Sequence, residues 1–263
     1  MQNRIDQLFQ NKKKNILSIF LTAGYPKPLD TLEIIQQLNN SEVDLIEVGI
    51  PYSDPIADGP VIQESSQIAL NNGVSLKFIF DQLKTLRTHT QLPVLLMGYL
   101  NCVVQFGIEN FYKKCHDIGI DGLILPDLPI DEFNKVHKPY ADKYNIHVVF
   151  LISPETSNDR IKLIDKTSKG FVYLVSSNST TGANKGVSNN LKQTFQNLES
   201  LQLKNPILIG FGIKGKTEFN KACELANGAI IGTSFIQMLG QSNDFKKDVA
   251  GFINGIKTEK INT

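Results

Sequence analysis

The chain has 263 residues, of which 41% are hydrophobic, so it can bury a substantial core and is not intrinsically disordered. Its 27 lysines and arginines nearly balance 26 aspartates and glutamates, and a net charge of +1 excludes the strongly basic binders of nucleic acids or membrane surfaces. The ligand is therefore expected to be small.

Eight short apolar runs recur along the chain, each bounded by Gly, Pro, Asn or Asp. Near-continuous apolar composition is typical of strands that are covered on both faces. The runs span residues 16–22, 44–48, 94–98, 121–126, 147–152, 171–176, 206–210 and 228–232. Most of the intervals carry helical periodicity, as where Leu32, Ile35 and Leu38 share a face. A short helix over about residues 4–9 precedes the first run.

Eight strands alternating with helices in about 250 residues predict an α/β fold, a single (β/α)8 TIM barrel with an extra N-terminal helix, as one domain over residues 1–263. An open doubly wound sheet is the alternative. The second and sixth βα units are the longest, with 50 and 35 residues between the starts of successive runs. Their extra length should form loops at the carboxyl face, where barrels build active sites.

Glu47 is the most unusual residue of the predicted strands. Period-2 alternation directs Ile46 and Val48 toward the helices, so Glu47 points into the barrel near its carboxyl end. An ionised carboxylate is costly to bury there, which favours a catalytic role. The structural alternative is a glutamate neutralised by an interior Lys or Arg.

Asp58 lies in a second-unit loop whose backbone is restricted by Pro51, Pro55 and Pro60. The sequence is consistent with two roles for Asp58. Asp58 is either the N-cap of a helix that starts near Pro60, with Asp54 capping an earlier turn, or a second catalytic carboxylate at the barrel mouth. Two carboxylates there would suit proton transfer, one protonatable and one ionised.

Glycine-bearing segments follow the sixth, seventh and eighth runs and predict a phosphate site. They span residues 179–182, 210–212 and 232–234. Glycine lets backbone N–H groups approach an anion, and a helix N-terminus adds a favourable dipole. Glycines that merely form turns are the alternative. Residues 176–186 are polar, rich in small side chains and long for a βα loop, so they predict a mobile lid or, alternatively, an exposed loop without a role.

Targeting and metal-binding patterns are absent from the sequence. The N-terminal stretch lacks a signal-peptide core, and no apolar run approaches the roughly 18 residues of a membrane span. Cys102, Cys115 and Cys223 show no paired spacing, and the four histidines show no ligand spacing. We therefore expect free thiols, no metal ion and a cytoplasmic location.

The run LIEVGIPYSDPIADGPVIQ at residues 45–63 resembles the signature of the tryptophan synthase alpha subunit family. The likeness covers essentially the whole chain. It continues through FLTAGYP (20–26), LLMGYLN (95–101), LILPDLP (123–129), YLVSSNSTTGA (173–183), GFGI (210–213) and GAIIGTSFI (228–236).

The resemblance implies a barrel enzyme of tryptophan biosynthesis, a carbon-carbon lyase that cleaves indole-3-glycerol phosphate to indole and glyceraldehyde 3-phosphate. It matches Glu47 to the catalytic proton shuttle and Asp58 to the carboxylate that binds the indole nitrogen. It also matches Phe20, Tyr173 and Thr181 to substrate contacts.

The same resemblance implies a phosphate pocket and a protein partner. The matching phosphate-binding residues are Gly182, Gly212, Gly232, Thr233 and Ser234. The chain itself is expected to need no cofactor. Pyridoxal phosphate is implied only in a partner beta subunit, which receives indole through a tunnel in an αββα heterotetramer. Family contacts with that partner match the loop around Asp54 and residues 99–101.

The chain departs from the family pattern at Tyr25, Ser177, Ser179 and Thr180, none of which is the implied acid or base. Two other functions are the alternatives. One is another phosphate-binding barrel isomerase or lyase, which the lack of lysine inside the eight runs disfavours. The other is a non-catalytic subunit that activates the beta partner, which the presence of both carboxylates disfavours.

Overall fold

The computed structural model describes residues 2–56, 58–175, 186–210 and 212–257. The strands of these residues form one parallel sheet. They are β1 (Ile16–Thr22), β2 (Leu45–Gly49), β3 (Val94–Met97), β4 (Gly122–Ile124), β5 (His147–Val149), β6 (Leu151–Ile152), β7 (Val172–Val175), β8 (Ile207–Gly210) and β9 (Gly228–Ile231).

The sheet closes into a barrel of eight strands. Its order is β5-β4-β3-β2-β1-β9-β8-β7-β6, and β1 pairs with both β2 and β9. Only Phe150 separates β5 from β6, so these segments are two halves of one barrel strand. Each strand falls within or beside one of the eight apolar runs. The (β/α)8 prediction is therefore confirmed, and the open doubly wound sheet is excluded.

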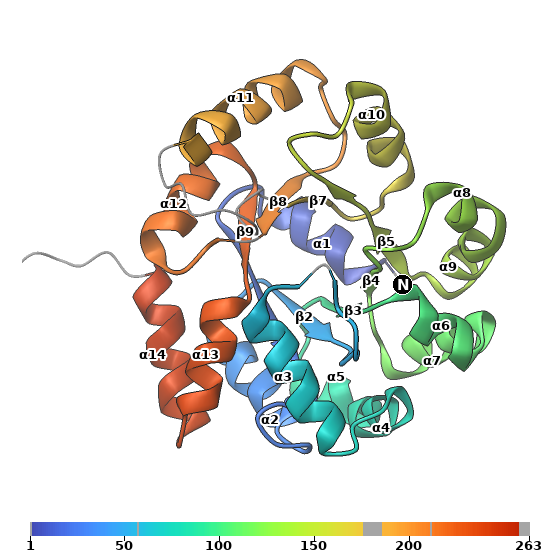
Figure 1. Ribbon diagram of the computed structural model, residues 1–263, viewed down its shortest axis with the longest axis vertical. Coiled ribbons are helices and arrows are strands. Elements are labelled where there is room, and N and C mark those ends of the chain that lie inside the picture. The colour runs from blue at the N-terminus through green and yellow to red at the C-terminus, as the bar shows by residue number, and fades with distance from the viewer. Residues whose placement is uncertain (1, 57, 176–185, 211, 258–263) are drawn as a thin grey trace, which may run out of the picture.

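Helices surround the strands in a ring (Figure 1). The α-helices are α1 (Arg4–Asn11), α2 (Thr31–Asn39), α3 (Pro60–Asn71), α4 (Leu76–Gln82), α5 (Leu86–His89), α6 (Leu100–Phe106), α7 (Ile108–Ile118), α8 (Ile130–Glu132), α9 (Lys138–Tyr144), α10 (Asn158–Thr167), α11 (Gly186–Ser200), α12 (Lys216–Leu225), α13 (Thr233–Gln241) and α14 (Phe245–Lys257). A 3-10 turn, η1 (Leu83–Thr85), and a π-helix, η2 (Phe133–His137), connect some of them.

Strand alternation divides the core into two layers. In β2, Ile46 and Val48 join the large cluster between the strands and the helices. Leu45 and, from β1, Ile16 and Phe20 join a smaller cluster inside the barrel. The period-2 pattern of a strand produces this division, because neighbouring side chains project to opposite faces. It also leaves the side chain of Glu47 on the inner face.

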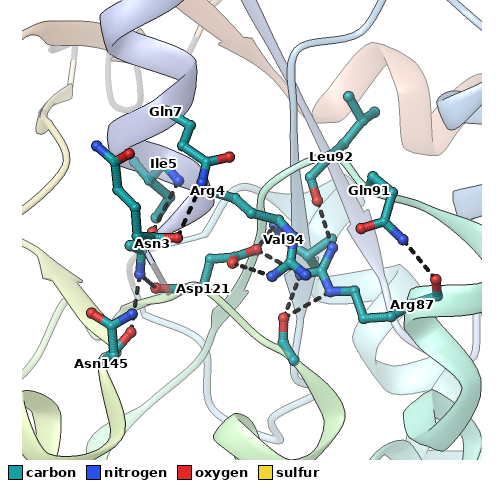
Figure 2. Close-up of polar contacts among 12 residues, drawn as sticks. Asn3, Arg4, Ile5, Gln7, Arg87, Gln91, Leu92, Val94, Asp121 and Asn145 are labelled. Carbon is teal, nitrogen blue, oxygen red and sulfur yellow. Dashed lines mark hydrogen bonds and ion pairs between the residues drawn. The ribbon is translucent and has the colours of Figure 1, made fainter.

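The short N-terminal helix α1 closes the amino end of the barrel, where its Ile5 joins the inner cluster. Polar contacts tie α1 to the barrel strands (Figure 2). Asp121, immediately before β4, is 3% exposed and accepts hydrogen bonds from Arg4, Arg87 and the backbone N–H of Val94. Asn3 caps the helix through the N–H of Ile5.

The two long βα units differ from the expectation of extra loops. In the second unit, a loop precedes α3, but most of the additional length is helical and forms α4, η1 and α5 before β3. Ile79, Phe80 and Leu83 of this stretch are buried in the large core cluster, where Phe80 packs against Phe106 and Phe111, and this packing of an apolar face stabilises the helices. In the sixth unit, the lid predicted over residues 176–186 lies outside the described residues except for Gly186, the first residue of α11.

Candidate active site

A cavity opens at the carboxyl ends of the strands. Its lining comes from β1, β2, β3, β7 and β9 and from the loops around α3, α12 and α13. The lining residues are Phe20, Glu47, Asp58, Ile62, Met97, Tyr173, Gly212, Ile213, Ile230, Gly232 and Thr233. The structure therefore brings together both candidate carboxylates, both candidate aromatic contacts and three of the candidate phosphate-binding residues.

Glu47 is fully buried at the wall of this cavity. Its Oε1 accepts a hydrogen bond from Ser18 Oγ at 2.7 Å, while its Oε2 has no partner among the described residues. Burial raises the pKa of Glu47 to about 7, although the Ser18 hydrogen bond opposes that rise. None of the ion pairs of the described chain includes Glu47, so the alternative of a neutralising Lys or Arg finds no support there. A carboxyl with this pKa can both donate and accept a proton near neutral pH.

Asp58 is not the N-cap of α3, and that alternative is wrong. The cap residue is Gly59, and Pro60 occupies the first turn of α3 without any side-chain cap. The Asp58 carboxylate instead accepts a hydrogen bond from Tyr99 Oη at 3.2 Å. Burial raises the pKa of Asp58 to about 6, opposed by the Tyr99 hydrogen bond. Asp58 is therefore mostly ionised at pH 7, in contrast to Glu47.

The two aromatic side chains at the cavity each lie against a glycine. The Phe20 ring packs over Gly49, and the Tyr173 hydroxyl packs over Gly210, so that a Cβ atom at either glycine would overlap the ring. Tyr173 is 4% exposed, and burial together with the charges of Glu47 and Asp58 raises the pKa of its hydroxyl. The hydroxyl consequently stays protonated and can serve as a hydrogen-bond donor.

The anion-binding features predicted for the last two βα units meet at one side of the cavity. Gly212 has a φ of +75°, a conformation that suits glycine, and Gly232 is the N-cap of α13. Thr233 is the first residue of α13, as predicted from the sequence. The Oγ atom of Ser234 is buried and has no hydrogen-bond partner among the described residues. A helix N-terminus and an unpaired hydroxyl are suitable donors for a phosphate.

Some predicted positions lie outside the described residues. These are Thr181 and Gly182, proposed as substrate and phosphate contacts, and the family departures Ser177, Ser179 and Thr180. The remaining departure, Tyr25, is half-buried and packs against both core clusters. Its hydroxyl lies close to the position that a Cβ at Gly240 would occupy.

Several residues at the cavity were not predicted from the sequence. Ser18 is the only polar residue of β1 before Thr22, and the same alternation that turns Phe20 inward would have placed its hydroxyl inside the barrel. Ile62, Ile213 and Ile230 supply apolar walls of the cavity. These isoleucines carry no distinguishing sequence signal, because the chain uses the same residue type throughout its core.

Neither a metal-binding cluster nor a membrane-spanning helix occurs in the described part of the chain. There, no three His, Cys, Asp or Glu side chains are grouped so as to hold a metal ion. No helix within the same residues has both the length and the apolar character to cross a bilayer. Cys102, Cys115 and Cys223 are free thiols, as expected.

A (β/α)8 barrel whose mouth combines two carboxylates with the glycine-led start of a helix is typical of phosphate-binding barrel enzymes. Comparison with known proteins narrows this class. The family model for the tryptophan synthase alpha chain matches residues 6–259. The chain belongs to the tryptophan synthase alpha chain family.

Individual relatives agree with this assignment. The chain is 52% identical to the tryptophan synthase alpha chain of Flavobacterium psychrophilum over 240 residues, which cover 91% of this chain and 94% of the relative. It is 50% identical to that of Flavobacterium johnsoniae, over 93% and 96% of the two chains. The crystal structure of tryptophan synthase subunit alpha from Legionella pneumophila superimposes with a TM-score of 0.87 at 31% identity, covering 97% of each chain.

The family assignment confirms the resemblance drawn from the sequence motifs. It also confirms the expected class of activity, because the tryptophan synthase alpha chain is a lyase of tryptophan biosynthesis.

Proposed function

We propose that the cavity at the carboxyl end of the barrel cleaves indole-3-glycerol phosphate to indole and glyceraldehyde 3-phosphate. One observation carries the proposal. A single cavity is lined by Glu47 and Asp58 and also by three residues from much later in the chain, Gly212, Gly232 and Thr233. Two carboxylates beside an anion-binding helix N-terminus suit an acid-base reaction on a phosphate ester.

The retro-aldol reaction consists of two proton transfers and the breaking of one bond. C3 of the indole ring must gain a proton, the hydroxyl on the adjacent side-chain carbon must lose one, and the bond between these carbons must break. The bonding electrons return to the indole ring, and the hydroxyl-bearing carbon becomes the aldehyde. Before the bond breaks, the protonated ring carries positive charge on its nitrogen, which a nearby carboxylate would stabilise.

We assign the two carboxylates to different parts of this reaction. Glu47, with a pKa raised to about 7, donates the proton to C3 and accepts the proton of the hydroxyl. Asp58, whose pKa is about 6, is mostly ionised at neutral pH, and it accepts the indole N–H and stabilises the positive charge. The lower pKa of Asp58 supports this division.

The remaining contacts come from the cavity lining and from Ser234, the second residue of α13. Phe20 and Tyr173 form the aromatic walls for the indole ring. Gly212, Gly232, Thr233 and Ser234 bind the phosphate through backbone N–H groups and hydroxyls, and the unpaired Ser234 hydroxyl supports this assignment. Gly182 and Thr181, outside the described residues, are proposed to complete the phosphate and substrate contacts.

The partner implied by the family is the beta subunit of tryptophan synthase, and we propose that the αββα assembly forms here too. Pyridoxal phosphate then belongs to the beta subunit, and this chain acts without a cofactor. The loop around Asp54 and residues 99–101 are the proposed contacts. A cytoplasmic location and a single domain over residues 1–263 complete the proposal.

Release of indole from indole-3-glycerol phosphate tests the proposed function directly. The assay is run on the chain alone and with its beta subunit, and we expect cleavage that the beta subunit stimulates. Stimulation of the beta reaction without any cleavage would show a non-catalytic activating subunit. Turnover of a different sugar phosphate, with no indole released, would show another barrel isomerase or lyase.

Substitution of the two carboxylates tests their assigned roles. Glu47→Gln and Asp58→Asn should each lower kcat for cleavage by several orders of magnitude, because each removes an acid-base or charge-stabilising group from the transition state. Binding of glycerol 3-phosphate, measured by calorimetry, should be retained, since the phosphate contacts are elsewhere in the cavity. A parallel loss of glycerol 3-phosphate affinity would contradict the assignment.

A further inference from the structure

The carboxyl group of Glu47 contacts a second buried polar side chain, Ser18. Ser18 and Glu47 are both 0% exposed, and Ser18 Oγ lies 2.7 Å from Glu47 Oε1. At this distance the hydroxyl donates a short hydrogen bond to one oxygen of the carboxyl group. The other oxygen, Oε2, has no partner among the described residues.

The pairing of β1 with β2 determines which side of Glu47 the hydroxyl occupies. Phe20 is in register with Glu47, and Ser18 is in register with Leu45, one inward position nearer the amino end of the barrel. Glu47 lines the cavity, and Ser18 is not among the residues that line it in the described chain. The hydroxyl therefore contacts Glu47 from the amino-end side of the cavity, which leaves Oε2 as the buried carboxyl oxygen without a hydrogen-bond donor among the described residues.

The structure assigns Ser18 as a positioning residue that keeps Oε1 of Glu47 occupied, so that the proton used in the reaction is carried by Oε2. The assignment rests on the proposed lyase function. A serine hydroxyl has one hydrogen, and donating it to Oε1 leaves that oxygen a poor site for the acid proton. The proton then enters and leaves through Oε2, and the hydrogen bond from Ser18 to Oε1 persists in both protonation states.

The hydroxyl also affects how readily Glu47 gives up its proton. Burial favours the neutral acid, and the Ser18 hydrogen bond favours the carboxylate. The other titratable groups that line the cavity are Asp58, from the loop before α3, and Tyr173, from β7. The strands beside β2 bring only Phe20 and Met97 to this part of the lining, neither of which is charged. Loss of the hydroxyl therefore leaves Glu47 without its one hydrogen-bond donor among the described residues.

The test compares Ser18→Ala with Ser18→Thr, which keeps the hydroxyl, and with the control Ser168→Ala. Ser168 is also buried, and its hydroxyl accepts a hydrogen bond from the N–H of Phe150, away from the cavity lining. Indole release is measured against pH with the beta subunit present. The pKa of Glu47 is measured by difference infrared spectroscopy, with Glu47→Gln to assign the carboxyl band.

We expect Ser18→Ala to lower kcat about 10- to 100-fold with KM changed less than about threefold, as for loss of a hydrogen bond to a charged group. The pH limb and the infrared band of Glu47 should both move to higher pH. Ser18→Thr should restore most of the activity, and Ser168→Ala should leave the pH profile unchanged. In the Glu47→Gln background, Ser18→Ala should cause no further loss of activity.

An unchanged carboxyl pKa and an unchanged kcat in Ser18→Ala would overturn the positioning role. So would an equal further loss in the Glu47→Gln background, because the hydroxyl would then act independently of Glu47. Failure of the unsubstituted chain to release indole would overturn the proposed function instead. The infrared measurement needs no turnover, so it still tests the Ser18 contact in that case.

Discussion

At the scale of single residues, the two carboxylates of the cavity owe their different chemistry to their surroundings. Glu47 is fully buried and has one hydroxyl donor, whereas Asp58 is only partly buried and lies on a loop beside Tyr99. Burial raises the pKa of both, to about 7 for Glu47 and to about 6 for Asp58. The site thus holds one group suited to carrying a proton and one suited to carrying charge at neutral pH.

The burial of Glu47 should reduce the stability of the fold at high pH. Its pKa in the folded chain is about 7, above the ordinary 4.5, so between these values the folded state binds more protons than the unfolded state. Stability is therefore lost as pH rises through this range and the loss is complete above about 7. The difference in pKa corresponds to about 3 kcal/mol.

Glu47→Gln removes this dependence on pH. Urea unfolding at pH 5 and pH 8.5 measures this dependence. From the lower to the higher pH, the free energy of unfolding of the variant should rise by about 2–3 kcal/mol relative to that of the unsubstituted chain. Any constant cost of the buried amide cancels in this comparison. Glu42→Gln, at an exposed position, is the control, and its free energy of unfolding relative to the unsubstituted chain should be the same at both pH values. A variant whose stability tracks that of the unsubstituted chain at both pH values would refute the burial argument.

At the scale of elements, the cavity wall depends on how neighbouring strands pack. β7 and β8 pair in parallel, and Gly210 at the end of β8 leaves the space that the Tyr173 hydroxyl and ring carbons occupy. This glycine is needed for close approach and not for an unusual backbone conformation. The aromatic wall of the cavity is therefore a property of two strands together.

Gly210→Ala should displace the Tyr173 ring. The added methyl group overlaps Tyr173, so we expect a loss of about 1–3 kcal/mol in unfolding free energy and a higher KM for indole-3-glycerol phosphate. The control is Gly251→Ala in α14, where a Cβ meets nothing within 4 Å. That substitution should stabilise the helix by about 0.5–1 kcal/mol without affecting KM. Equal effects of the two substitutions would contradict the packing explanation.

At the scale of the whole molecule, the cavity and the buried ion pairs of Asp121 lie at opposite ends of the barrel. The cavity lies at the carboxyl ends of the strands, and the amino end is closed by α1 and the ion pairs of Asp121 with Arg4 and Arg87 (Figure 2). These charges are largely buried, since the Asp121 side chain is 4% exposed and that of Arg87 is 19% exposed. Buried ion pairs are sensitive to the loss of one partner.

Asp121→Asn should lower the unfolding free energy by about 3 kcal/mol, because it leaves two guanidinium groups without their counter-charge. The kcat of the folded enzyme should not change, because the cluster is at the end of the barrel opposite the cavity. Glu109→Gln, which breaks the exposed ion pair with Lys143, is the control and should have little effect. A loss of kcat in folded Asp121→Asn would show that the two ends of the barrel are coupled.

Much of the architecture and part of the site could be read from the sequence. The eight apolar runs match the barrel strands because a strand covered on both faces must be apolar almost throughout. Alternation then placed Phe20 and Glu47 inside the barrel, since the side-chain period of a strand does not depend on its neighbours. The start of α13 at Thr233, after Gly232, was equally visible as a local signal.

Other features depended on contacts between segments far apart in the chain. The length of the second βα unit predicted loops, yet tertiary packing of its apolar residues produced helices α4 and α5. The capping explanation of Asp58 was wrong because Tyr99, which is 41 positions away in sequence, donates to its carboxylate. Propensities at a single position contain no information about such a partner.

The amino-acid order by itself therefore determined the strand and helix alternation, the inward direction of Glu47 and, through its motifs, the family. Each of these is a periodic or local property of the chain. Three features required the folded chain: the hydrogen bond from Ser18 to Glu47, the hydrogen bond from Tyr99 to Asp58, and the cavity that both carboxylates share with the N-terminus of α13. The physical reason is strand register: closure of the barrel selects which side chains meet, and burial there sets their pKa values.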